Sequence, residues 1–400
     1  MKKRVLLVEP GYKTYYPPLG LMKISTWHKK RKHLVDFVKH NQQSRDNLTA
    51  DTYGLEKHYD KIYITSLFTY HAKEVIRATR YYQKRYPEAE IAVGGIMATL
   101  LPDYVKEKTG ITPHVGLLDG GENCAPDYSL FPDLQCSISF TTRGCKRKCR
   151  FCAVYRHEPV FFVKEDWGKD IDNTKDLIIF WDNNWLLSPN FVRDAEKLAK
   201  LGKKFDFNQG LDCRLFNREK AKLLARTKIS PLRFAFDNHS EEGHIQRAIK
   251  LAQKHGFKDI RVYLLYNSED PNDTPEYFFY RANEMNKLGA VSYPMRYRPI
   301  DSLDKRYVSP YWNRVLLRGL KLTLMFYFTK GMIGRGRKGF ETIYGTNAMQ
   351  FKRKLKKIYK YDRELKIERF GIEYPRTSFR DLPEARTHIQ EICYAKTKKG

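Results

Sequence analysis

Short apolar runs alternate with longer segments of helical spacing along the first 300 residues of the chain. The early runs are predicted to be strands, and most of them stop at Pro- or Gly-rich breakers: Arg4–Val8, Asp60–Leu67, Glu90–Val93 and His114–Leu118. Strands that alternate with helices are typical of a parallel sheet covered by helices on both faces. The sequence therefore predicts an α/β protein whose first domain, residues 1–124, contains such a sheet.

A Pro- and Asp-rich segment without periodicity, residues 125–136, is predicted to be a linker. After it the alternation resumes with six candidate strands: Ser137–Thr142, Leu177–Trp181, Phe205–Asn208, Leu232–Phe236, Ile260–Leu265 and Val291–Met295. Six strand–helix units over residues 137–300 indicate an incomplete relative of the eight-stranded TIM barrel. Active sites of such barrels lie at the carboxyl ends of the strands, and polar residues follow the strands here, among them Asp182, Gln209 and Asp237.

The last hundred residues are strongly basic. Between 301 and 400 there are 24 Lys and Arg against 10 Asp and Glu, half of the chain's net charge of +28. Phe351–Lys366 has roughly helical spacing within this basic region, which we predict to be mainly helical. Such a charge favours polyanionic partners, and tRNA or another nucleic acid comes first. The alternative is a lysine-rich surface without a dedicated partner.

The hydropathy pattern contains no run of about 18 uncharged apolar residues, so no membrane-spanning helix is predicted. The N-terminal residues have the pattern of a first strand and lack the cleavage site of a signal peptide, so we expect a cytoplasmic protein. Seven cysteines are present, an odd number, and three of them lie within eight residues. Clustered cysteines of this kind favour metal or redox chemistry over a disulfide scaffold.

The three clustered cysteines are Cys145, Cys149 and Cys152, directly after a predicted strand. Thiolates are the usual ligands of iron–sulfur clusters, and three ligands for four irons leave one iron open, as catalytic metal centres require. Four Lys and Arg residues between the cysteines would offset the negative charge of the thiolates. A structural zinc site, with Cys124 or Cys136 as the fourth ligand, is the alternative.

The motif Cys145-x-x-x-Cys149-x-Phe151-Cys152 resembles the signature of radical S-adenosylmethionine (SAM) enzymes. Other segments are similar to members with an N-terminal cobalamin-binding-like, Rossmann-like domain: Pro17–Leu21, Val93–Gly95, Gly120–Glu122, Phe180–Leu187 and Leu232–Ser240. The resemblance covers about residues 1–300. It implies a Rossmann-like domain followed by a partial (β/α)6 TIM barrel.

The same resemblance implies the chemistry. The three cysteines would hold a [4Fe-4S] cluster whose open iron chelates SAM, and Phe151 would lie beside the cofactors. One electron would then cleave SAM to methionine and a 5′-deoxyadenosyl radical. By position, Asp182 and Asn183 would meet the methionine ammonium group, and Arg214 and Asp237 would lie near its carboxylate or the ribose.

Two departures from the family pattern concern the cofactors. The Asp-x-His-x-x-Gly loop that ligates cobalt is missing after the first strand, where the sequence reads Glu9-Pro-Gly-Tyr-Lys-Thr-Tyr-Tyr16. Because some members bind cobalamin without that His, cobalamin stays an open possibility. Asp237 also stands where the family usually has Glu, which puts the SAM contact there in question.

Three functions are compatible with these observations. The first is a radical SAM enzyme that methylates or otherwise modifies nucleic acid. The second is a radical SAM enzyme that acts on a peptide or small metabolite, and the third is a non-catalytic iron–sulfur protein that senses redox state and binds nucleic acid. Both enzymes would need an electron donor of the flavodoxin or ferredoxin type.

Overall fold

The computed structural model describes residues 2–14, 16–40, 58–326, 332–334 and 336–370. The chain divides into two compact units, each of which is described by itself. The first comprises Met1–Asp194, Lys200–Gln209 and Pro299–Tyr307, and the second comprises Ala195–Ala199, Gly210–Arg298 and Val308–Gly400. No helix among the described residues combines the length and the apolar character that crossing a membrane requires.

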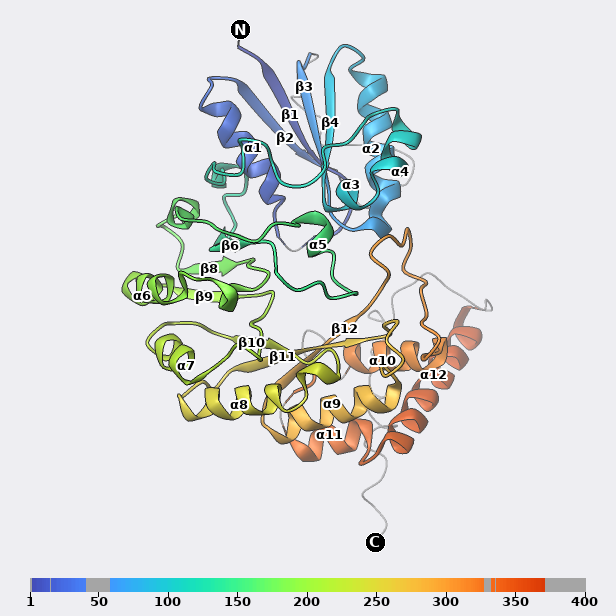
Figure 1. Ribbon diagram of the computed structural model, residues 1–400. Helices are drawn as coiled ribbons and strands as arrows, with labels where there is room; N and C mark the ends of the chain where they lie inside the picture. The colour runs from blue at the N-terminus through green and yellow to red at the C-terminus, as the bar shows by residue number, and fades with distance from the viewer. Residues whose placement is uncertain (1, 15, 41–57, 327–331, 335, 371–400) are drawn as a thin grey trace. The chain divides into compact units, whose positions relative to one another are not determined.

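The first unit opens with a parallel four-stranded sheet in the order β2-β1-β3-β4 (Figure 1). Its strands are β1 (Arg4–Glu9), β2 (Leu34–Lys39), β3 (Lys61–Ser66) and β4 (Glu90–Gly95). The helices of this part are α1 (Leu19–Lys29), α2 (Ala72–Arg85), α3 (Ile96–Leu100) and α4 (Pro102–Thr109). This arrangement confirms the predicted Rossmann-like parallel sheet.

Helices α1 and α2 cover opposite faces of that sheet, because successive strand residues point to opposite sides. Val5 and Leu7 of β1 pack in one cluster with Leu21 of α1. Leu6 of β1 packs in another cluster with Val75 of α2. Burial on both faces explains why β1 appears in the sequence as an unbroken apolar run.

The structure differs from the predicted strands of this domain at two places. His114–Leu118 is not a strand: His114 N donates to Val93 O over 2.8 Å, but the chain then turns at Gly116, whose φ is +87°. The Thr99 hydroxyl accepts the Gly116 N–H at 3.0 Å and fixes this turn. Strand β2, in contrast, was not among the predicted strands.

The six strands predicted after the linker are all present and lie in two parallel three-stranded sheets. In the first unit the order is β5-β8-β9, with β5 (Cys136–Ser139), β8 (Leu177–Phe180) and β9 (Lys204–Phe207). In the second unit it is β10-β11-β12, with β10 (Leu232–Ala235), β11 (Ile260–Tyr266) and β12 (Val291–Arg296). Helices follow the strands as expected: α6 (Phe191–Leu201), α7 (Arg218–Ala225), α8 (His244–Lys254) and α9 (Pro275–Lys287).

The described part of the basic C-terminal region is mainly helical, as predicted, and from Val308 onward it belongs to the second unit. Its helices are α10 (Arg314–Phe326), α11 (Arg337–Tyr344) and α12 (Ala348–Phe370). Helix α12 packs closely on α10, since a Cβ on Gly319 would lie 2.3 Å from the Leu355 carbonyl oxygen. The Arg318 guanidinium also pairs with the Asp362 carboxylate at 3.1 Å, so α12 is held by packing and by charge.

Candidate functional site

The three clustered cysteines lie on one loop, residues 144–158, which we call the cysteine loop. It follows the short strand β6 (Thr142–Arg143), contains α5 (Val154–His157) and leads to β7 (Phe162–Val163). The thiols of Cys145, Cys149 and Cys152 are half-buried. The Cys152 N–H donates to Cys149 O over 3.0 Å, so the loop turns back on itself between these two cysteines.

Two backbone features bring the ends of the cysteine loop together. Strands β6 and β7 pair antiparallel, with Arg143 opposite Phe162. Gly144 has φ +70°, and a Cβ at this position would lie 2.2 Å from the Val160 carbonyl oxygen. A glycine is required here because the backbone is left-handed and the returning strand leaves no room for a side chain.

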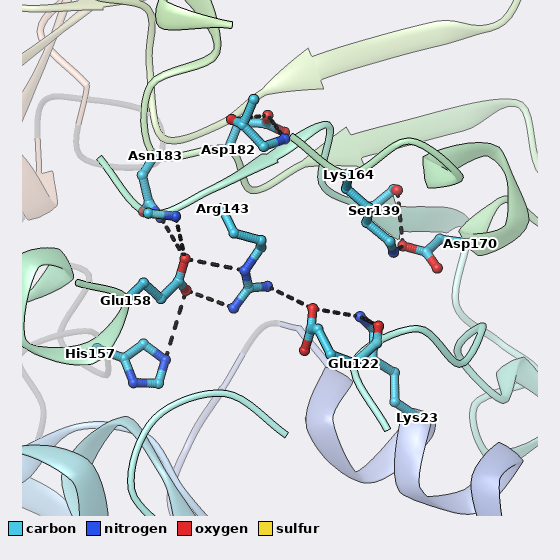
Figure 2. Close-up of polar contacts among 12 residues, drawn as sticks. Lys23, Glu122, Ser139, Arg143, His157, Glu158, Lys164, Asp170, Asp182 and Asn183 are labelled. Atoms are coloured by element: carbon cyan, nitrogen blue, oxygen red, sulfur yellow. Dashed lines mark hydrogen bonds and ion pairs between the residues drawn. The ribbon is translucent and has the colours of Figure 1, made fainter. Parts of the chain in front are cut away.

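Glu158 is the buried acid that closes the cysteine loop (Figure 2). Its Oε2 accepts the Gly144 N–H at 2.8 Å and the Asn183 Nδ2 at 3.0 Å. Its other oxygen lies 2.7 Å from Arg143 Nη2. The carboxylate of Glu158, the last residue of the loop, thus links the loop's end to its first residue, Gly144, and to the segment after β8.

Asp182, directly after β8, is buried and engaged by the end of the neighbouring strand. Four donors point at its carboxylate, the backbone N–H and the hydroxyl of Thr141 and of Thr142, at 2.5–3.1 Å. Burial raises the pKa of Asp182 to about 6, while the hydrogen bonds from Thr141 act in the opposite sense. In this structure the carboxylate therefore ties together two segments that follow parallel strands.

Replacing Asp182 with alanine is expected to destabilise the first unit by about 2–4 kcal/mol, because four buried donors would lose their acceptor. The comparison is Asp172→Ala, which removes an Asx turn with Thr174 but leaves no donor buried. Urea unfolding of the two variants measures the difference. Equal unfolding free energies would show that the Thr141–Thr142 contacts contribute nothing.

The two asparagines that follow Asp182 also face the cysteine loop, although only Asn183 was predicted. Besides the contact of Asn183 with Glu158, the Asn184 Nδ2 lies 3.9 Å from Cys145 Sγ. Asn184 is buried. The structure therefore brings Asp182, Asn183 and Asn184 to the start of the loop, while Phe151 is half-buried within it.

Arg214 and Asp237 lie in the second unit, where the acidic residue Glu241 connects them. Arg214 Nε contacts Asp212 Oδ1 at 2.7 Å, and its Nη1 lies 3.7 Å from Glu241 Oε1. Glu241 in turn accepts the Asp237 N–H at 2.6 Å. Burial and the nearby Glu241 charge raise the pKa of Asp237, so this unit contains a cluster of acids with one arginine at the end of β10.

Sequence reasoning did not identify Glu158 or Glu241. Glu241 has a local signal, since Asn238 and Glu241 form a capping box around the short turn after β10. Glu158 has none, because its partners Arg143 and Asn183 are 15 and 25 residues away and contact it only in the folded chain. A carboxylate at the end of the cysteine loop could be found only from the structure.

The donor chemistry of the cysteine loop fits an iron–sulfur cluster. Three thiols lie within eight residues, and the Arg147 N–H points at Cys145 Sγ over 3.4 Å. The thiols are not drawn together as a ready set of ligands: among the described residues, no three His, Cys, Asp or Glu side chains form a group that could hold a metal ion.

The cationic side chains of the cysteine loop point outward. Lys146, Lys148 and Arg150 are exposed, whereas the cysteines between them are half-buried. The Lys146 ammonium lies 5.3 Å from the ring centroid of Phe161, a cation–π contact. The loop thus presents positive charge to the solvent while its thiols lie underneath.

Comparisons with known proteins support the fold. No protein-family model matches the sequence, and no curated protein matches it either. Among solved structures, the chain is similar to a radical S-adenosylmethionine methyltransferase, TsrM from Kitasatospora setae, with tryptophan substrate and a SAM analogue bound. The TM-score is 0.59 at 14% identity, over 76% of this chain and 75% of TsrM.

A second solved structure is OxsB, a cobalamin-dependent S-adenosylmethionine radical enzyme, with a TM-score of 0.44 and 12% identity. That match spans 68% of this chain and half of the OxsB chain. The match to TsrM shows that the fold of this protein is that of a radical SAM enzyme, as the cysteine motif predicted. Its nearer counterpart of the two is TsrM, which it matches over three quarters of both chains.

Proposed function

We propose that this protein is a radical SAM enzyme. The observation that carries the proposal is the position of three cysteines on one loop, beside the carboxyl ends of β5 and β8, in a fold similar to that of TsrM. A [4Fe-4S] cluster bound to Cys145, Cys149 and Cys152 would supply an open iron for SAM and one electron for its reductive cleavage.

The chain's own residues would bind and orient the cofactors. Asp182 has its oxygens engaged by Thr141 and Thr142, so its contribution is to fix the strand ends. The side-chain oxygen of Asn183 is the acceptor we propose for the methionine ammonium group. In the second unit, we propose that Arg214 and Asp237 contact the methionine carboxylate or the ribose.

Cleavage of SAM needs an electron donor, and we propose an acidic carrier of the flavodoxin or ferredoxin type. The exposed Lys146, Lys148 and Arg150 lie on the loop that bears the thiols. Opposite charges steer two proteins into contact and fix their orientation. An acidic carrier attracted to these side chains would arrive next to the proposed cluster.

The test of the proposed function is anaerobic reconstitution with iron and sulfide, followed by spectroscopy with and without SAM. We expect a four-iron centre whose spectrum changes on addition of SAM, and release of 5′-deoxyadenosine after reduction. A centre that ignores SAM would favour the non-catalytic iron–sulfur protein. Uptake of zinc without any four-iron centre would contradict the proposal altogether.

We further propose that the substrate is RNA, because α12 carries a continuous basic face. Phe351, Leu355 and Ile358 are buried against the second unit. Cations occupy the exposed side of the same helix: Arg353, Lys356, Lys357 and Lys360. Lys and Arg on one helix face, with tyrosines interleaved, suit phosphate contacts and base stacking.

Neutralising Arg353, Lys356, Lys357 and Lys360 to serine is expected to weaken tRNA binding and to flatten its salt dependence. Each lost phosphate contact removes about 0.7–0.9 from the slope of log K against log salt, so the slope should fall by about 3. Binding measured at several salt concentrations, by fluorescence anisotropy, gives the slope directly.

The matched control removes the same net charge from a helix of the first unit. Helix α2 exposes four cations at similar spacing: Lys73, Arg77, Arg80 and Lys84. If the two quadruple variants lose equal affinity, net charge alone explains the binding and α12 is no interface. Absence of RNA binding by the unmodified protein would leave the peptide or small-metabolite substrate as the better proposal.

A further inference from the structure

Glu158 closes the cysteine loop. It is the last member of a row of buried charged side chains that begins at Lys23 of α1, in the N-terminal domain (residues 1–124). Lys23, on α1, donates to Glu122 Oε1 over 2.9 Å and to the Glu122 carbonyl oxygen over 2.8 Å. Glu122 Oε1 also lies 3.4 Å from Arg143 Nη1. Arg143 then contacts both oxygens of Glu158, at 2.7 and 3.1 Å.

Figure 2 shows these four side chains as one connected row of alternating charge. We call Lys23, Glu122, Arg143 and Glu158 the ion-pair relay. Three of its side chains are at most 7% exposed, and Glu122 is 17% exposed. Two of its members, Lys23 and Glu122, are 99 residues apart in the sequence, so only the fold brings them together.

The relay depends on all of its members. Burial lowers the pKa of Lys23, while Glu122 acts in the opposite sense. Burial raises the pKa of Glu122, but the charges of Arg143 and Lys23 lower it by more, so the pKa lies below its usual value. Removing one partner of a buried pair leaves the other charge uncompensated in a low-dielectric interior, so the loss of Lys23 would disturb Glu122 and its contact with Arg143.

The ring of Phe140 fixes the two cations of the relay. Arg143 Cζ lies 3.8 Å from the ring centroid, and Lys23 Nζ lies 5.9 Å from it. A guanidinium stacked on a ring and forked onto a carboxylate has little freedom to reorient. The position of Glu158, and with it the Gly144 N–H, is therefore set from the side of the N-terminal domain.

We propose that Glu158 is the positioning residue of the cysteine loop, and that the ion-pair relay lets the N-terminal domain hold this loop in place. The proposal rests on the proposed function in taking the cysteine loop as the site of an iron–sulfur cluster. The rigidity of the loop can be tested without that function. Neither Glu158 nor Lys23 needs to touch a cofactor: Lys23 acts through Glu122 and Arg143, and Glu158 through the N–H of Gly144, next to Cys145. Because of this coupling, retention of the cluster would depend on the N-terminal domain as well as on the cysteine loop.

Limited trypsin cleavage of the metal-free protein tests the relay without any cofactor, since the cysteine loop contains Lys146, Arg147, Lys148, Arg150 and Arg156. In Glu158→Gln and Lys23→Met we expect cleavage within the loop to be about tenfold faster or more, because a buried ion pair is broken. Cleavage elsewhere in the chain reports global unfolding and should change less. Lys23→Arg keeps the cation and should restore slow cleavage.

The matched control is Lys29→Met, on the same helix. Lys29 pairs with Asp127 at 2.6 Å but is 45% exposed and lies outside the relay. The second readout is the rate at which an iron chelator removes iron from reconstituted protein, which should rise in Lys23→Met and Glu158→Gln but not in Lys29→Met.

The outcomes separate the relay from the proposed function. Faster loop cleavage together with faster iron loss supports the inference. Faster loop cleavage in a protein that never takes up four irons also supports the relay, but contradicts the proposed function. Loop cleavage in Lys23→Met that equals the wild type or the Lys29→Met control overturns the inference, as does acceleration that is equal inside and outside the loop.

Discussion

Replacing Cys149 with alanine is expected to abolish both the four-iron centre and the release of 5′-deoxyadenosine. Cys149 is the middle thiol of the cysteine loop, with one cysteine on either side. Two remaining thiolates could not hold a cluster that needs three protein ligands while one iron stays open for SAM. The measurement is iron and sulfide content after anaerobic reconstitution, together with chromatographic detection of the nucleoside product.

Cys213→Ala is the control for this experiment. Its thiol is buried in the second unit, and burial raises the pKa of Cys213 to about 12, so it is a poor candidate ligand. This variant should load four irons and cleave SAM like the wild type. Normal iron content with retained turnover in Cys149→Ala would refute the ligand assignment.

The sequence was sufficient to predict the six strands after the linker and three of the four strands of the N-terminal sheet. Apolar runs bounded by breakers identify buried strands well, and β1, β8 and β11 lie where their periodicity placed them. Strand β2 was missed because an Asp and flanking Lys and His residues interrupt its apolar pattern. The prediction of a strand at His114–Leu118 was wrong, because Gly116 takes a left-handed conformation that an apolar run does not reveal.

The predicted site residues were found from their position after strands, and the structure groups them accordingly. Asp182 and Asn183 lie beside the cysteine loop in the first unit, and Arg214 and Asp237 gather around Glu241 in the second. Their contacts with SAM stay a prediction.

What the sequence could not provide is the set of charges that fixes the loop. Lys23 and Glu122 are 99 residues apart, and nothing in the sequence around either residue indicates that they pair. Their pairing follows from the packing of α1 against the segment after α4, and long-range packing has no periodic signature. Buried ion pairs of this kind are identified only when the fold is known.

Gly144→Ala is expected to have the second large effect, because two separate costs fall on one residue. Its φ of +70° strains any side chain by about 1–2 kcal/mol. The added Cβ would also lie 2.2 Å from the Val160 carbonyl oxygen and 3.0 Å from that of Glu158. Both neighbours are backbone, so relief requires the end of the cysteine loop to move away from its start.

Gly110→Ala separates the two costs. Gly110 ends α4 with φ +75°, nearly the same conformation, but no atom lies within 4 Å of the position that its Cβ would occupy. Urea unfolding should therefore show a loss of about 1–2 kcal/mol for Gly110→Ala and about 2 kcal/mol more for Gly144→Ala. Only Gly144→Ala should also lose iron binding and expose the loop to trypsin, because only there does the methyl group push against Glu158. If the two variants behave alike, the close approach of the loop ends is not what fixes the conformation of the cysteine loop.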